Sequence, residues 1–111
     1  MASFRVSAAI VEAAPGVPPP AVLDAARRAV AAGWHVEDAF LDVEPLARGT
    51  GPPRATVRFV VPTANDAEED AAAWAAGRAL AAAVGRVAAW TDLRVLRRSH
   101  GRWVRLDGPR S

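Results

Sequence analysis

The sequence contains no cysteine, lysine or tyrosine among its 111 residues. The absence of cysteine excludes disulfides, thiol nucleophiles and zinc–thiolate sites. The absence of lysine excludes Schiff-base chemistry and a P-loop lysine, and the absence of tyrosine excludes a tyrosine acid or base. Every strongly cationic side chain is therefore an arginine.

The sequence also lacks a long apolar run, because no stretch reaches the roughly 20 residues that a membrane-spanning helix needs. The apolar N-terminal segment is interrupted by Arg5 and Glu12, and it alternates as a strand does rather than resembling the core of a signal peptide. We therefore expect a cytoplasmic protein with no membrane partner, and nothing in the composition indicates a cofactor.

Apolar periodicity gives the order of the secondary structure. Alternating segments predict strands near residues 3–12, 34–44, 55–61 and 92–98, and helical spacing predicts helices near residues 20–32 and 66–88. This repeated strand–helix–strand order predicts one α+β domain over residues 1–106. We expect a ferredoxin-like βαββαβ sandwich, in which an antiparallel sheet carries two helices on one face. Residues 107–111 are expected to form a disordered tail.

Local signals mark the irregularities of these elements. The strand near residues 34–44 changes its alternation at residues 37–38, which predicts a β-bulge. Residues 45–53 are rich in proline and glycine and predict a long, mobile connecting loop. A turn at residues 99–101 allows residues 102–106 to return as an extra C-terminal hairpin strand.

Charge is unevenly distributed along the chain. Residues 1–75 hold six arginines against ten acidic residues, whereas residues 76–111 hold eight arginines against two acidic residues. A basic C-terminal third favours a polyanion or an acidic partner. Two alternatives remain: the acidic and basic parts face each other, or the arginines are simply solvated.

Histidine is the scarce residue on which acid–base chemistry would depend. His35 is the candidate catalytic group, because imidazole titrates near neutral pH and Glu37 and Asp38 follow it closely. No nucleophile accompanies it, since no serine lies in a nucleophile-elbow context. His35 and Glu37, with the distant His100, form a weak set of metal ligands, so we predict no metal site.

The aromatic residues supply the candidate binding positions. Trp74 lies off the centre of its helix's apolar stripe, a position that suits packing under a loop or in a subunit interface. Trp103 lies in an arginine-rich stretch that suits base stacking and phosphate contact, or a cation–π pair with Arg94 or Arg98. The residues proposed for ligand or partner binding are Trp34, Arg58, Trp74, Arg94, Arg98, Arg102, Trp103 and Arg105.

The layout resembles two known groups of proteins. It resembles RNA-binding RRM domains, whose central strands carry glycines and paired aromatic residues. The equivalent segment here, residues 54–61 (RATVRFVV), has neither feature, so this resemblance does not imply RNA binding. Over residues 3–98 the layout is also similar to small dimeric α+β barrel proteins, which include cofactor-free monooxygenases.

Three functions follow as hypotheses. The preferred one is a small non-catalytic binding or assembly module, homodimeric, that binds a ligand or protein partner through its sheet face. The second is a small cofactor-free enzyme of the monooxygenase or cyclase type, which would act on an apolar substrate between sheet and helices through Trp34, His35 and Arg58. The third is nucleic-acid binding, with an affinity that falls steeply as salt is added, through the C-terminal residues Arg94, Arg97, Arg98, Arg102, Trp103 and Arg105.

Overall fold

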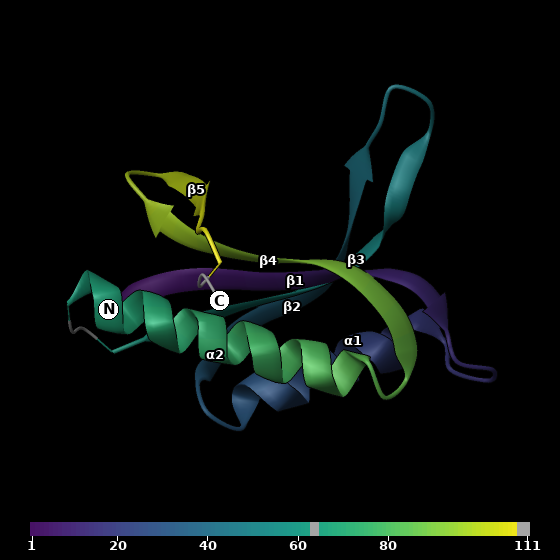
Figure 1. Cartoon of the computed structure of the whole chain (residues 1–111), viewed down its shortest axis with the longest axis horizontal. Helices are drawn as coiled ribbons and strands as arrows, with labels where there is room; N and C mark the ends of the chain where they lie inside the picture. The colour runs from purple at the N-terminus through teal and green to yellow at the C-terminus, as the bar shows by residue number, and fades with distance from the viewer. Residues whose placement is uncertain (63–64, 109–111) are drawn as a thin grey trace.

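The computed structural model describes residues 1–62 and 65–108, which form a curled antiparallel sheet of five strands with two helices against it (Figure 1). In chain order the elements are β1 (Ala2–Ala13), α1 (Pro19–Ala31), β2 (His35–Pro45), β3 (Thr50–Val61), α2 (Asp66–Val84), β4 (Ala88–Ser99) and β5 (Arg102–Arg105). Both helices lie on one side of the sheet, as predicted. The α+β class is confirmed, and the order of the elements is consistent with the ferredoxin-like expectation.

The sheet has the strand order β2-β3-β1-β4-β5, so that β1 and β3 lie at its centre. These two strands alternate most regularly in the sequence, and their helix-facing side chains are fully buried. The core of the sheet consists of Phe4, Val6 and Ala8 on β1, Ala55, Val57 and Phe59 on β3, and Val95 on β4. The rings of Phe4 and Phe59 stack at a centroid distance of 5.9 Å.

Small residues bring α2 close to the sheet. Its core stripe is Ala73, Ala76, Gly77, Leu80 and Val84, all buried. A Cβ atom on Gly77 would lie only 3.1 Å from Cγ2 of Val95. Gly77 therefore sets the distance between α2 and β4.

The expected loop over residues 45–53 was wrong, because most of it continues the β2–β3 hairpin. Pro45 pairs with Thr50, and the turn between them is closed by the Leu46 amide, which donates to the Gly49 carbonyl at 3.0 Å. Gly49 has a φ of 76°, which suits a turn glycine. We call residues 43–53 the arm. It extends past the last β1–β3 pair and rises from the side of the sheet opposite the helices (Figure 1).

The boundary between α2 and β4 was also wrong. The helix ends at Val84 rather than near residue 88, and β4 begins at Ala88 rather than near residue 92. Ala88 pairs with Ala13 of β1, and the Ala14 amide donates to the Val87 carbonyl at 2.8 Å. Alanine favours a helix, but pairing with a neighbouring strand overrides that preference here.

Two irregular features are confirmed. The β2–β3 register shifts between Val36 and Asp38, which places a bulge at residue 37 as predicted. The extra C-terminal strand is β5, joined to β4 by a tight turn in which His100 and Gly101 have φ values of 49° and 77°. The β4–β5 hairpin rises on the same side of the sheet as the arm (Figure 1).

The expected disordered tail is only partly described. Residues 109–111 lie outside the described residues, whereas Asp107 and Gly108 are placed beside α2. A Cβ atom on Gly108 would lie 3.4 Å from Cη2 of Trp74. Neither of the helices in the described ranges is long and apolar enough to cross a membrane.

Candidate ligand-binding groove on the open sheet face

The face of the sheet opposite the helices, which we call the open face, is polar. Strict alternation along each strand puts one set of side chains toward the helices and the other set here. The open face carries Arg5 and Ser7 from β1, Arg54, Thr56 and Arg58 from β3, Asp38, Phe40 and Asp42 from β2, Arg94, Leu96 and Arg98 from β4, and Trp103 and Arg105 from β5. Arginines from the four strands β1, β3, β4 and β5 therefore meet on one surface.

A groove of about 280 Å³ lies on this face, between the arm and the β4–β5 hairpin. Its floor is formed by Arg5, Ser7, Arg54 and Thr56, one wall by Arg94, Leu96 and Trp103, and the other wall by Asp42, Val43, Glu44 and Pro45. The groove thus combines guanidinium groups, carboxylates and an apolar wall. We take it as the candidate site.

Arg5 lies between two aromatic rings in the middle of the open face. Its Cζ atom is 4.3 Å from the centroid of Trp103 and 5.3 Å from that of Phe40. The guanidinium groups of Arg58 and Arg98 also lie 5.3 Å from the Trp103 ring. The indole therefore gathers three positive charges through cation–π contacts.

This cluster of Arg5, Arg58, Arg98 and Trp103, which we call the arginine–tryptophan cluster, is short of negative charge. Arg5 and Arg58 are direct cross-strand partners. Burial first, and then the charge of Arg58, holds the pKa of Arg5 below its ordinary value. The buried Nε atoms of Arg5 and Arg58 have no hydrogen-bond partner among the described residues. The Nε of Arg58 nevertheless forms an ion pair with Oε1 of Glu37 at 3.3 Å, outside hydrogen-bonding geometry, whereas no ion pair forms at Arg5 or Arg98 within the described part of the chain.

The other end of the groove is neutralised by an internal network. Arg54, only 6% exposed, donates to the Ser7 hydroxyl at 3.0 Å and to Oδ2 of Asp92 at 3.1 Å. Asp92 also pairs with Arg94 at 2.7 Å and with Arg105 at 3.3 Å. Burial raises the pKa of Asp92, but the hydrogen bond from Arg94 and the nearby arginine charges outweigh it, so this pKa lies below its ordinary value.

Glu44 of the arm reaches across the groove to Arg94 of β4 at 3.5 Å. This contact joins two segments that flank the central strands β3 and β1. Burial lowers the pKa of Arg94, yet its hydrogen bonds to Asp92 and Glu44 leave that pKa above the ordinary value. The network therefore closes one end of the groove and neutralises the charge of Arg94.

The structure brings together some of the binding residues expected from the sequence. Arg58, Arg94, Arg98, Trp103 and Arg105 all lie on the open face. The expected cation–π partner of Trp103 was partly right, because Arg98 contacts the ring; Arg5 approaches it more closely. The remaining candidates, which are Trp34, His35, Trp74 and Arg102, lie elsewhere.

Trp34 and His35 lie at the edge of the sheet. They line a separate hollow of about 530 Å³ with Met1, Val60 and Pro62. The Trp34 ring packs 6.0 Å from that of Phe59, at the margin of the core. Glu37, the carboxylate nearest to His35 in sequence, is turned to Arg58, and within residues 1–62 and 65–108 no three His, Asp or Glu side chains gather as a metal site.

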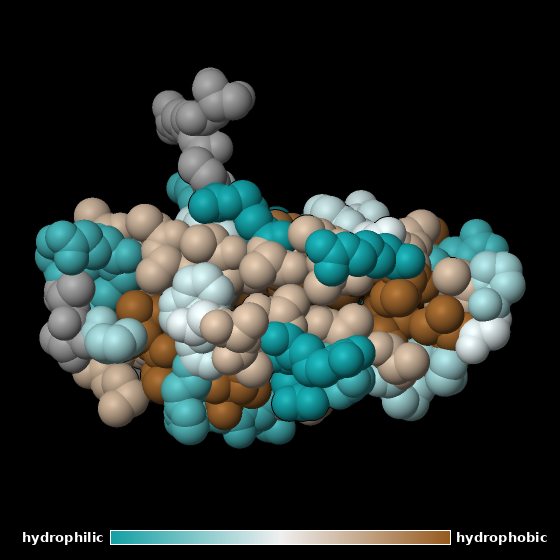
Figure 2. Space-filling model, turned by 90° about the horizontal axis from the view of Figure 1, so that it is seen from below, coloured by the Kyte–Doolittle hydropathy of each residue, from teal (hydrophilic) through white to brown (hydrophobic). Residues whose placement is uncertain are grey.

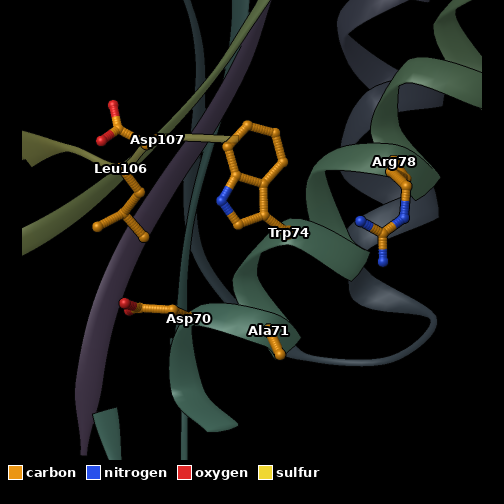
Figure 3. A pocket seen from close by; sticks show the side chains of 6 residues that line it. All are labelled: Asp70, Ala71, Trp74, Arg78, Leu106 and Asp107. Atoms are coloured by element: carbon orange, nitrogen blue, oxygen red, sulfur yellow. The ribbon is translucent and has the colours of Figure 1, made fainter. Parts of the chain in front are cut away.

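Trp74 lies on the helix side. It lines a hollow of about 450 Å³ with Asp70, Arg78, Leu106 and Asp107. Figure 3 shows its indole between the C-terminal segment and α2. The sequence predicted packing under a loop or in a subunit interface; the segment beside the ring here is the C-terminal segment that follows β5. The surrounding helix surface is mostly weakly apolar, with scattered charged side chains (Figure 2).

Arg97 and Arg102 do not join the open face. Arg97 donates to Asp70 at 3.0 Å and to Glu69 at 2.9 Å, and its guanidinium lies 4.8 Å from the Phe4 ring, on the side of the helices. Arg102 is exposed opposite Ser99. The C-terminal arginines therefore do not form one continuous basic surface, and Arg97 neutralises the acidic start of α2.

Sequence reasoning missed Arg5, Phe40, Arg54 and Asp92 as site residues. The alternation of β1 did place Arg5 and Ser7 on the same face, so the signal for Arg5 was present. The backbone of Asp92 has a left-handed φ of 56°, and no local sequence pattern predicted this conformation. Guanidinium groups that lie beside an aromatic ring can bind a carboxylate or phosphate through paired hydrogen bonds.

No family model, curated protein or solved structure matches this chain.

Proposed function

We propose that this protein is a binding module that holds a small anionic ligand in the groove on its open face. The observation that carries this proposal is the cross-strand pair of Arg5 and Arg58. Like charges placed directly opposite each other destabilise a sheet. A carboxylate or another oxyanion between the two guanidinium groups would relieve that repulsion and give the buried Nε of Arg5 the hydrogen-bond partner that it lacks among the described residues.

The size and chemistry of the groove support a small ligand. Its volume of about 280 Å³ lies just below the usual range of drug-sized pockets, roughly 300–1,000 Å³. Trp103 and Leu96 provide an apolar wall for the body of the ligand, and Arg5 provides the anion contact. We infer that the role is binding rather than catalysis, because no histidine lines the groove and neither of its hydroxyl groups is bonded to a base. The Ser7 hydroxyl accepts hydrogen bonds from the Arg54 guanidinium, and the Thr56 hydroxyl donates to the Arg54 carbonyl.

The test is a titration of the full chain with 3-phenylpropionate, followed in ¹H–¹⁵N NMR spectra. We expect the largest shifts at Arg5, Ser7 and Trp103. Arg5→Gln should weaken the affinity by at least about tenfold, because hydrogen bonds to a charged group are worth about 1.5–3 kcal/mol. Arg102→Gln is the matched control and should leave the affinity unchanged, since Arg102 is an exposed arginine outside the groove.

Two results would contradict this proposal. One is the absence of any saturable shift with 3-phenylpropionate. The other is a set of shifts centred on the Trp34–His35 hollow or on the Trp74 hollow, with Arg5→Gln binding as well as the unchanged protein. The second result would favour the enzyme hypothesis if the shifts surround His35.

Nucleic-acid binding through the same face is disfavoured by its acidic residues. Asp38 and Asp42 lie on the open face and Glu44 lines the groove, where they would repel a chain of phosphates. A single-stranded oligonucleotide added in place of the small carboxylate tests this directly. Tight binding that weakens steeply with salt would replace the small-ligand proposal.

We also propose that the fold is ferredoxin-like and that the chain forms a homodimer. The strand order β2-β3-β1-β4, with a helix after β1 and after β3, supports the first proposal. The exposed edge strand β2 favours pairing through strand edges over face-to-face packing, which would bury the arginines of both copies. Light scattering gives the mass in solution, and a monomer would overturn the dimer.

A further inference from the structure

Some charged side chains of the groove form ion pairs within the described residues, and others do not. Arg54 and Arg94 are paired with Asp92, and Arg94 is also paired with Glu44. Arg5 has no ion pair within the described residues, as noted above. Asp42, on the opposite wall, likewise forms no salt bridge with any residue in the described ranges; one of its carboxylate oxygens accepts the Val43 amide at 3.0 Å.

Arg5 and Asp42 therefore face one hollow with opposite, uncompensated charges. They do not contact each other, because β3 lies between their strands β1 and β2. The two residues are separated by two strand spacings across the sheet and by four residues along it, because Arg5 is level with Asp38 rather than with Asp42. Both side chains nevertheless line the same groove. Burial and the charge of Arg58 lower the pKa of Arg5, and the charges of Asp42 and, less strongly, Asp38 oppose that lowering.

The rest of the groove lining is suited to an apolar body. Leu96 and Trp103 lie on one wall and Val43 and Pro45 on the other. Val43 is 47% exposed and is one of the residues that line the groove. A ligand that matches Arg5, Asp42 and the apolar walls of the groove has a negative group, a positive group and a small apolar side chain.

We propose that the groove binds a small zwitterion, an α-amino acid with an aromatic or branched apolar side chain. The carboxylate contacts Arg5, the ammonium contacts Asp42, and the side chain lies against Leu96 and Trp103. This inference rests on the proposed function and adds to it the second charge of the ligand.

The experiment compares three molecules that share one phenyl body and differ only in charge. Phenylalanine carries both charges, 3-phenylpropionate carries only the carboxylate, and 2-phenylethylamine carries only the ammonium. We expect phenylalanine to bind the full chain about tenfold more tightly than either relative, as expected for one added charge-assisted contact. A second set built on an isobutyl body, with leucine as the zwitterion, covers branched side chains.

Asp42→Asn is the decisive variant, and Asp38→Asn is its matched control. In both residues a carboxylate oxygen accepts the amide of the next residue, which the asparagine oxygen can also do. Both lie on the open face of β2, but only Asp42 lines the groove. Asp42→Asn should abolish the advantage of phenylalanine over 3-phenylpropionate, and Asp38→Asn should preserve it.

The outcomes separate this inference from the proposed function. Equal affinity for the zwitterion and the carboxylate in both sets overturns the zwitterion and leaves the anion-binding module standing. An advantage of phenylalanine that survives Asp42→Asn overturns the assigned contact. Failure of every molecule to bind overturns both proposals.

Discussion

Arg5 on β1 and Arg58 on β3 are direct cross-strand partners at the centre of the open face. Two guanidinium groups at this spacing repel each other; the Trp103 ring contacts both, and Glu37 forms an ion pair with Arg58 but not with Arg5. The sheet thus tolerates a local instability at the position where the proposed ligand binds. Such a compromise is typical of a functional surface rather than of a structural one.

A double-mutant cycle measures this repulsion. We expect Arg5→Gln and Arg58→Gln to show an unfavourable coupling energy between the two arginines, of about 0.5 kcal/mol in the free energy of unfolding. Urea unfolding of the unchanged protein, both single variants and the double variant gives the value. A favourable coupling would mean that the two side chains stabilise each other, which would leave no repulsion for a bound anion to relieve.

Asp92 is expected to be the most costly acidic residue of the open face to neutralise. Asp92→Asn should lower the free energy of unfolding by about 2 kcal/mol, because it leaves the buried Arg54 without its carboxylate. Asparagine tolerates the left-handed φ of 56°, so the loss reports charge rather than backbone strain. Asp24→Asn, at an exposed carboxylate paired with Arg27 and Arg28, should cost much less in the same urea experiment. Equal losses at the two sites would refute the network.

The same residue should shape the response to acid. The pKa of Asp92 is lower in the folded protein than its ordinary value, so the unfolded chain binds the proton more readily. Its stabilising contribution is complete above about pH 4 and is lost as the pH falls through the folded pKa. Unfolding measured from neutral to acidic pH should therefore show a shallower acid limb for Asp92→Asn. Parallel curves for the two proteins would contradict this assignment.

The turn that holds β5 should control the position of Trp103. His100 and Gly101 both have positive φ values, which is the conformation of a two-residue hairpin turn. Gly101→Val should cost about 1–2 kcal/mol and loosen the β4–β5 hairpin, since a branched side chain resists this conformation. His100→Asn should tighten it. Amide hydrogen exchange along β5 measures both effects, and faster exchange in His100→Asn would show that the turn has another conformation.

The sequence predicted the elements whose signals are local and regular. Alternation located β1 and β3, and the break in alternation at residues 37–38 located the bulge in β2. The arm and the start of β4 were missed for one reason: their residues, Pro52, Pro53, Ala88 and Ala89 among them, have poor strand propensity. They are extended because a neighbouring strand pairs with them, and such pairing is visible only in three dimensions.

The site was less predictable than the fold. The arginines on β4 and β5 were predicted as binding residues because they cluster in the sequence. In the structure Arg97 bonds to Glu69 of α2, and Arg102 lies outside the open face. Arg5 lies about a hundred residues from Trp103 in the chain, and only the sheet order brings the two together. A cluster assembled from β1, β3, β4 and β5 leaves no contiguous motif.

The arm contains only the paired ends of β2 and β3 and the turn between them, and no third strand of the described residues pairs with it. Pro52 and Pro53 have no amide hydrogen that could bond to a further strand. Residues 50–53 of β3 therefore pair with β2 alone, beyond the last β1–β3 pair. A two-stranded ribbon that is attached at its base pivots more easily than a strand held on both sides. The width of the groove therefore depends on the angle between the arm and the sheet. The ion pair between Glu44 and Arg94 joins the arm to β4 and holds it at the observed angle.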